Sequence, residues 1–280
     1  FMNKTWLILL LVTASSFSAL GQTFIQNTMY NTNRFVYNPA SAGLDDEGLS
    51  DQWTLTALGR LQWAGIDGSP QLASISASRN YDFGSVGGYI MRDEIGPLSS
   101  TSINASYAFP LQINNEDVLS LGVSFGISQR AINMTVLSVD PDPILPPIGS
   151  LLNSSVFATN LAVGAFYQGI EENGYEQFFV GFSGQDLLEP NISGLLEDPS
   201  GSSTSNVPRS FYLTAGYKIP IGNWTSNAFN YIQPAVMARS QGAVIQADVS
   251  LLGKYQSLYA GLNYRGLAFA GDNSESIGAM

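Results

Sequence analysis

The sequence predicts an all-β fold, a transmembrane antiparallel β-barrel of the outer-membrane type. From Trp53 onward, apolar and small polar residues alternate with a period of two, as in strands that face lipid on one side and an interior on the other. Charged residues make up only 12% of the chain and its mean hydropathy is +0.08, yet no apolar run beyond the N-terminal region approaches the length of a membrane helix. We count about eleven strands and expect about twelve to fourteen in the complete chain, because bacterial single-chain barrels close with an even number.

Residues 1–21 have the features of a cleaved secretory signal peptide. Lys4 precedes an apolar run from Trp6 to Val12, and small residues at Ala19 and Gly21 end the segment. An uncleaved membrane anchor is the alternative, but the serines that follow the run end it too early to span a bilayer.

Two further segments follow the signal peptide. Residues 22–52 lack sustained alternation, so we expect a periplasmic N-terminal lead-in segment that packs at the barrel entrance. Its acidic run, Asp45–Asp51, lacks the ligand spacing of a calcium loop and is interpreted as a solvated turn. Residues 53–280 form the predicted barrel. No terminal strand ending in an aromatic residue is visible before Met280, so we expect this barrel to be truncated at its C-terminus.

The segment Leu119–Ser128 shows the alternation most clearly, with aliphatic or aromatic residues at odd positions and Ser or Gly at even ones. Loop lengths give an independent indication, because the long connections 130–154 and 186–207 fall on the same side of the predicted sheet as the turn Gly65–Pro70. A soluble β-sandwich, the main structural alternative, has no reason to sort its loops in this way. Aromatic residues near strand ends fit an interfacial girdle; they are Trp63, Tyr107, Phe109, Tyr167, Tyr217 and Tyr264.

The composition argues against several classes of function. The chain has no His and no Cys, which removes serine–histidine triads, cysteine nucleophiles and the usual zinc sites. Its net charge of −11 and its lack of a Lys/Arg cluster argue against binding of nucleic acid. We therefore expect no enzyme activity, no cofactor and no metal site.

A few charged residues fall at positions that the alternation assigns to the barrel interior. They are Arg60, Arg92, Lys218, Arg239, Asp248 and Arg265. Interior charges are costly unless they are paired or hydrated, so we expect a small lumen network or the border of a channel. Arg60 and Gln62 either belong to such a structural network or brace the neighbouring turn and contact a partner. Trp63 is expected to be an interfacial anchor.

The tip of the first predicted hairpin carries a recognisable motif. It reads Arg60-Leu61-Gln62-Trp63-Ala64-Gly65-Ile66-Asp67-Gly68-Ser69-Pro70, in which Asp67-Gly68 suits the positive φ of a turn. Two further segments accompany it, Asn38-Pro39-Ala40-Ser41-Ala42-Gly43 and Asp93-Glu94-Ile95-Gly96-Pro97. Together they resemble the PorP/SprF family of type IX secretion proteins. By this resemblance, the residues of a partner-binding or structural motif are Asn38, Pro39, Gly43, Arg60, Gln62, Trp63, Gly65, Ile66, Asp67, Gly68 and Pro70.

The resemblance implies a component of the machinery that moves proteins across the outer membrane of Bacteroidota, often together with gliding adhesins. The implied partners are outer-membrane lipid and either periplasmic ring components of the machinery or the C-terminal domain of a secreted adhesin. A porin-like transport barrel for small solutes is the competing function, in which the interior charges line a solute path.

Overall fold

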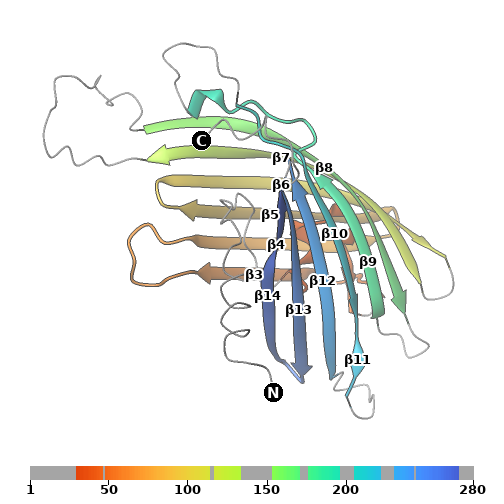
Figure 1. Ribbon diagram of the computed structural model, residues 1–280. Helices are drawn as coiled ribbons and strands as arrows, with labels where there is room; N and C mark the ends of the chain where they lie inside the picture. The colour runs from red at the N-terminus through yellow and green to blue at the C-terminus, as the bar shows by residue number, and fades with distance from the viewer. Residues whose placement is uncertain are drawn as a thin grey trace, which may run out of the picture.

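The structure is a computed structural model that describes residues 30–46, 48–113, 117–133, 153–170, 176–195, 205–221, 230–242 and 244–270. The predicted signal peptide, the lead-in before Tyr30 and the C-terminal residues 271–280 lie outside this range. Figure 1 shows a single large sheet that curls on itself, with its first strands behind and its last strands in front.

The sheet contains twelve antiparallel strands, eleven of which follow one another along a path from β3 to β14. These are β3 (Thr54–Leu61), β4 (Gln71–Tyr81), β5 (Gly84–Ile95), β6 (Leu98–Gln112), β7 (Val118–Asn133), β8 (Asn153–Ile170), β9 (Glu176–Gln185), β10 (Ser210–Tyr217), β12 (Tyr231–Gln241), β13 (Val244–Tyr255) and β14 (Leu258–Ala270). The short β11 (Ile219–Pro220) pairs with β12, and β1 (Leu44–Asp45) pairs with β2 (Gly48–Leu49) in a separate small sheet. Three 3₁₀ helices complete the described elements, η1 (Arg34–Val36), η2 (Pro39–Ser41) and η4 (Ser193–Leu195).

The prediction of an all-β antiparallel sheet of about this many strands is confirmed. Within the described residues the end strands β3 and β14 do not pair with each other, so a closed barrel stays a prediction. No helix in this part of the chain is both long enough and apolar enough to cross a membrane.

The alternation of the sequence sorts side chains between the two faces of the sheet. On the convex face, Ile103 of β6 and Phe125 of β7 are 60% and 54% exposed. On the concave face, the neighbouring Ser102, Ser106 and Ser124 are buried. On these two strands the convex face is therefore apolar and the concave face hydroxylic, the inverse of a soluble protein.

Connection lengths also differ between the two ends of the sheet. We call the end at which β3 joins β4 the loop end, and the end at which β4 joins β5 the turn end. The long β7–β8 and β9–β10 connections both lie at the loop end, whereas β13 and β14 are joined at the turn end by two residues, Gln256 and Ser257. This is the sorting of loop length that the sequence predicts.

Residues 30–46, which we call the inner segment, lie against the concave face of the sheet. Buried side chains of this segment, including Tyr30, Phe35, Tyr37 and Ala40, pack in one cluster with Tyr89, Phe166, Phe179 and Tyr212 of the strands. The sequence predicts a lead-in segment at the barrel entrance, and that placement stays a prediction. The segment has many apolar and small residues, which gain stability when the curved sheet removes them from water.

Candidate functional site

The inner segment is fixed at its centre by Asn38, which caps η2 and binds two strands at once. Its side-chain Oδ1 accepts a hydrogen bond of 3.0 Å from the backbone N–H of Ala40. Its Nδ2 donates to the carbonyls of Ala165 in β8, at 2.9 Å, and Phe182 in β9, at 3.3 Å. Asn38 therefore ends the extended backbone before η2 and joins the segment to the sheet.

Glycines of three adjacent strands form the floor on which this motif rests. A Cβ added at Gly122 in β7 would collide with the backbone of Ala40, and one added at Gly164 in β8 would collide with the side-chain oxygen of Asn38. A Cβ at Gly181 in β9 would lie 3.0 Å from Asn38 Nδ2. The close approach of the inner segment to the sheet thus depends on the absence of side chains at these positions.

Polar side chains of β9 bind backbone carbonyls of the inner segment. Ser183 Oγ donates to the carbonyl of Tyr37 at 2.6 Å. Gln185 Nε2 donates to the carbonyls of Val36 and Tyr37 at 3.0 and 2.8 Å. Buried backbone groups need such partners, so the concave face is built to receive this particular segment.

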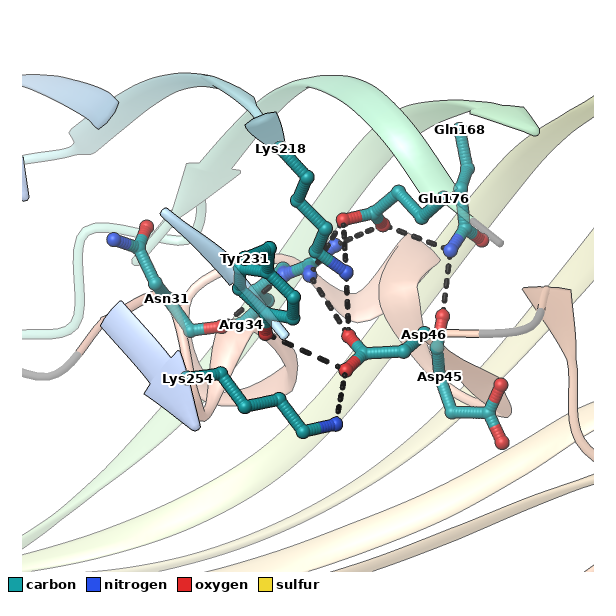
Figure 2. A network of polar contacts seen from close by, with 9 residues as sticks. All are labelled: Asn31, Arg34, Asp45, Asp46, Gln168, Glu176, Lys218, Tyr231 and Lys254. Atoms are coloured by element: carbon teal, nitrogen blue, oxygen red, sulfur yellow. Dashed lines mark hydrogen bonds and ion pairs between the residues drawn. The ribbon is translucent and has the colours of Figure 1, made fainter. Parts of the chain in front are cut away.

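A group of charged residues, which we call the charge cluster, joins the inner segment to the sheet at the turn end (Figure 2). Arg34 of η1 binds Glu176 of β9 through two contacts, Nη1–Oε2 at 2.5 Å and Nη2–Oε1 at 2.9 Å. Lys218, which follows β10, places its Nζ 3.0 Å from Glu176 Oε1 and 2.6 Å from Asp46 Oδ1. The side chains of Glu176 and Lys218 are fully buried. Each buried charge therefore has an opposite charge in direct contact, the condition under which burial is tolerated.

Further groups complete the charge cluster. Lys254 Nζ lies 3.5 Å from Asp46 Oδ2, and the hydroxyl of Tyr231 donates to the same oxygen at 3.4 Å. Gln168 Nε2 donates to Glu176 Oε2 at 2.8 Å and to the carbonyl of Asp45 at 2.6 Å. Partial burial by itself would raise the pKa of Asp46, but the nearby Lys218, Arg34 and Lys254 lower that pKa to about 2. Asp46 thus stays ionised at neutral pH and holds the segment electrostatically.

The start of the inner segment bridges strands that are far apart in the sheet order. Tyr30 Oη and Asn31 Nδ2 lie 2.9 and 2.8 Å from Ser250 Oγ in β13. Asn33 Oδ1 accepts a hydrogen bond of 3.2 Å from Ser76 Oγ in β4. The segment therefore spans the concave side from one part of the sheet to the other.

Comparison with known families decides which family this chain belongs to. Residues 19–280 match the family described as type IX secretion system membrane protein PorP/SprF. The chain belongs to the PorP/SprF family. The match covers the inner segment and every described strand, and it confirms the resemblance stated from the three motifs. Neither the comparison with curated proteins nor that with solved structures found a match.

The PorP/SprF hairpin motif lies at the loop end. Arg60 Nη2 donates to Gln62 Oε1 at 2.7 Å, and both side chains are half-buried. Leu61, Trp63 and Ile66 are 68%, 64% and 62% exposed. Positive φ angles occur at Trp63, Gly65 and Gly68, and Asp67 and Pro70 complete the turn, in which the carbonyl of Pro70 accepts a bond of 3.0 Å from the Gln62 N–H.

The structure brings two of the three motifs together. The backbone N–H of Gly96, in the downstream motif, donates to the carbonyl of Gly68 at 2.9 Å. Asn38 and Pro39 lie on the glycine floor instead, and Gly43 packs near the turn end beside Ser85. The upstream motif thus serves the inner segment, and it is separate from the hairpin tip.

The predicted interior charges have different positions. Lys218, Arg239 and Asp248 are buried on the concave face, where Arg239 Nη2 lies 2.7 Å from Asp248 Oδ2. Arg92 differs from the expectation, because it lies on the convex face, 59% exposed and paired with Glu94. The inward positions of β5 at this level are the apolar Tyr89 and Met91. The side chain of Arg265 lies outside the described part of the chain.

Sequence reasoning missed most of the charge cluster. It identified Lys218 but not Arg34, Glu176 or Lys254, and the interpretation of the acidic run as a solvated turn is wrong for Asp46, which binds Lys218. One signal was available, because Arg34 is the only Lys or Arg between residues 22 and 52. Within the described ranges no group of three Asp, Glu, His or Cys side chains could hold a metal ion.

Proposed function

We propose that this PorP/SprF chain is an outer-membrane barrel of the type IX secretion and gliding machinery that acts by binding proteins. Its partners are ring components on the periplasmic side or the C-terminal domain of a secreted adhesin. Family membership supports the role in secretion, and the apolar convex face supports a position within lipid. The predicted signal peptide supports export to the outer membrane.

The observation that carries a binding role is the occupied concave side. The inner segment lies where a solute path would run, and it is held by the glycine floor, by Ser183 and Gln185, and by the charge cluster. A barrel whose interior holds its own chain presents only its ends to partners. The apolar side chains of Trp63 and Ile66 are exposed at the loop end.

A porin-like transport barrel is the second candidate, and one observation favours it. An open cavity of about 1080 Å³ lies between the inner segment and β3. Its lining mixes polar residues such as Asp45, Thr54 and Thr56 with apolar ones such as Leu55 and Leu252, and it lies along β3, the end strand of the sheet.

Two measurements on the same preparation separate these functions. The tagged full-length protein is purified from its native envelope, and its partners are identified by mass spectrometry. We expect ring components or an adhesin C-terminal domain to co-purify, and little ion conductance in planar bilayers. Strong conductance without any secretion component would contradict the proposal.

A hairpin-tip variant locates the binding surface. Trp63→Ala combined with Ile66→Asp is compared with Leu188→Ala, which removes another exposed apolar side chain, 51% exposed, from a different connection. If the tip docks the partner, only the double variant loses co-purification while keeping a heat-modifiable barrel band on a gel. Equal recovery from both variants would move the docking surface to the turn end.

A further inference from the structure

The inner segment contacts almost every part of the concave face. Tyr30 and Asn31 bind Ser250 of β13, Asn33 binds Ser76 of β4, and Asn38 binds β8 and β9. Asp46 then reaches Lys218 and the cluster at the turn end. A segment with these contacts runs across the concave side of the curved sheet and joins β13 to β4.

Two different anchors hold the segment in this position. The glycine floor of Gly122, Gly164 and Gly181 admits its backbone at a distance that any side chain would prevent. The charge cluster holds the segment at the turn end of the sheet, where Arg34 and Asp46 of the segment face Glu176 and Lys218 of the sheet. In both anchors, residues of the sheet match particular residues of the segment in shape or charge. The concave face is therefore shaped to hold this segment.

The space next to the segment is already open. The cavity of about 1080 Å³ has the inner segment as one wall, through Asn31, Phe35 and Asp45, and β3 as another, through Thr54 and Thr56. Displacement of the segment would join its own volume to this cavity along the polar concave face. The segment therefore lies between this cavity and the strands β7, β8 and β9, against which it packs.

We infer that residues 30–46 are a built-in plug that closes the interior of the barrel, with the glycine floor as its seat and the charge cluster as its latch at the turn end. The plug keeps an outer-membrane protein with a hydroxylic interior from leaking solutes. This inference rests on the proposed membrane barrel, but it does not depend on which partner the protein binds.

Wedge variants test the plug by conductance. Gly122→Val and Gly164→Val place a side chain where the segment sits, while Val suits the strands that carry it. Gly59→Val is the matched control, since a Cβ there meets nothing within 4 Å. In planar bilayers we expect the wild type and Gly59→Val to stay near a closed baseline and the wedge variants to conduct. Wild-type conductance equal to that of the wedge variants would overturn the inference.

Labelling of single cysteines tests the plug without a disruptive change, because the chain has no cysteine of its own. Ala42→Cys replaces a side chain in a residue that is 0% exposed, and Gln52→Cys replaces an exposed one. In membranes we expect a hydrophilic maleimide to label Ala42→Cys slower by about tenfold or more, since reaction requires local opening. Equal rates would overturn the inference even if the wedge variants failed to fold.

A reversible lock completes the test. Asn33→Cys with Ser76→Cys replaces a side-chain hydrogen bond of 3.2 Å between the segment and β4 by a disulfide. In the Gly122→Val background, oxidation is expected to restore the closed baseline and reduction to remove it. Mass spectrometry verifies that the disulfide has formed. If conductance is then the same in the oxidised and reduced states, the current does not pass through the position of the plug, and the inference is overturned.

Discussion

Glu176 is the residue on which the charge cluster depends most, because its buried carboxylate contacts both Arg34 and Lys218. Glu176→Gln keeps the shape of the side chain but removes the charge that compensates these two cations. We expect the free energy of unfolding to fall by about 3 kcal/mol, the usual effect of breaking a buried ion pair. Urea unfolding in detergent micelles measures it. Glu189→Gln, which breaks the exposed pair with Arg209, is the control and should cost less than about 1 kcal/mol.

Asp46 makes the contribution of the charge cluster to stability depend on pH. Its pKa is lowered from 3.8 to about 2, so its charged form stabilises the folded state above about pH 4, and this contribution is lost as the pH falls toward 2. We expect the difference in unfolding free energy between wild type and Asp46→Asn to be constant from pH 5 to 7 and to shrink between about pH 4 and 2. A difference that grows on acidification would contradict this assignment.

The cluster shows where sequence reasoning stops at the scale of single residues. Lys218 was recognised as an interior charge because it falls on the polar side of a regular alternation. The sequence did not reveal Arg34 and Glu176, because their contact joins residues 142 positions apart. Neither residue lies in a motif or a periodic segment before the chain is folded.

At the scale of elements, the inner segment depends on Asn38, whose side chain satisfies three backbone groups. Asn38→Ala removes the η2 cap and both contacts to the strands, so we expect a loss of about 1–3 kcal/mol of unfolding free energy. Asn191→Ala is the control, because Asn191 caps an exposed turn through the N–H of Ser193. If urea unfolding shows the same loss of unfolding free energy in both variants, Asn38 does not anchor the inner segment.

Individual strands were predictable because one face of each carries a repeating side-chain type. The alternation at residues 119–128 becomes the middle of β7, with Ser120 and Ser124 buried and Leu121 and Phe125 exposed. β5 is one of several strands that depart from this pattern. Its inward side chain at Tyr89 packs against Phe35 with ring centroids 5.9 Å apart, so the inner face of this strand is apolar where it meets the inner segment. The rule of polar residues inside fails because the interior is filled by protein.

At the scale of the whole molecule, the inverted distribution of polarity and the sorting of connections both follow from local sequence. They were predictable because each strand contributes independently to a convex apolar face and because loop length can be read along the chain. The occupancy of the concave side was not predictable, since it depends on the match between the glycines of three strands and a segment distant in sequence.

The convex face supplies a prediction that separates a membrane barrel from a secreted soluble sheet. Phe125 is 54% exposed at the middle of β7, so Phe125→Arg would place a charge in the hydrocarbon of a bilayer. We expect the free energy of folding into phosphatidylcholine vesicles to worsen by about 2–4 kcal/mol. Gln129→Arg, on the same face but paired across the strands with Thr101, lies nearer the loop end and should cost only about 0–1 kcal/mol. In a soluble sheet both substitutions would fall on a water-exposed surface and change stability by about 0.5 kcal/mol or less, so equal effects would contradict a position in the membrane.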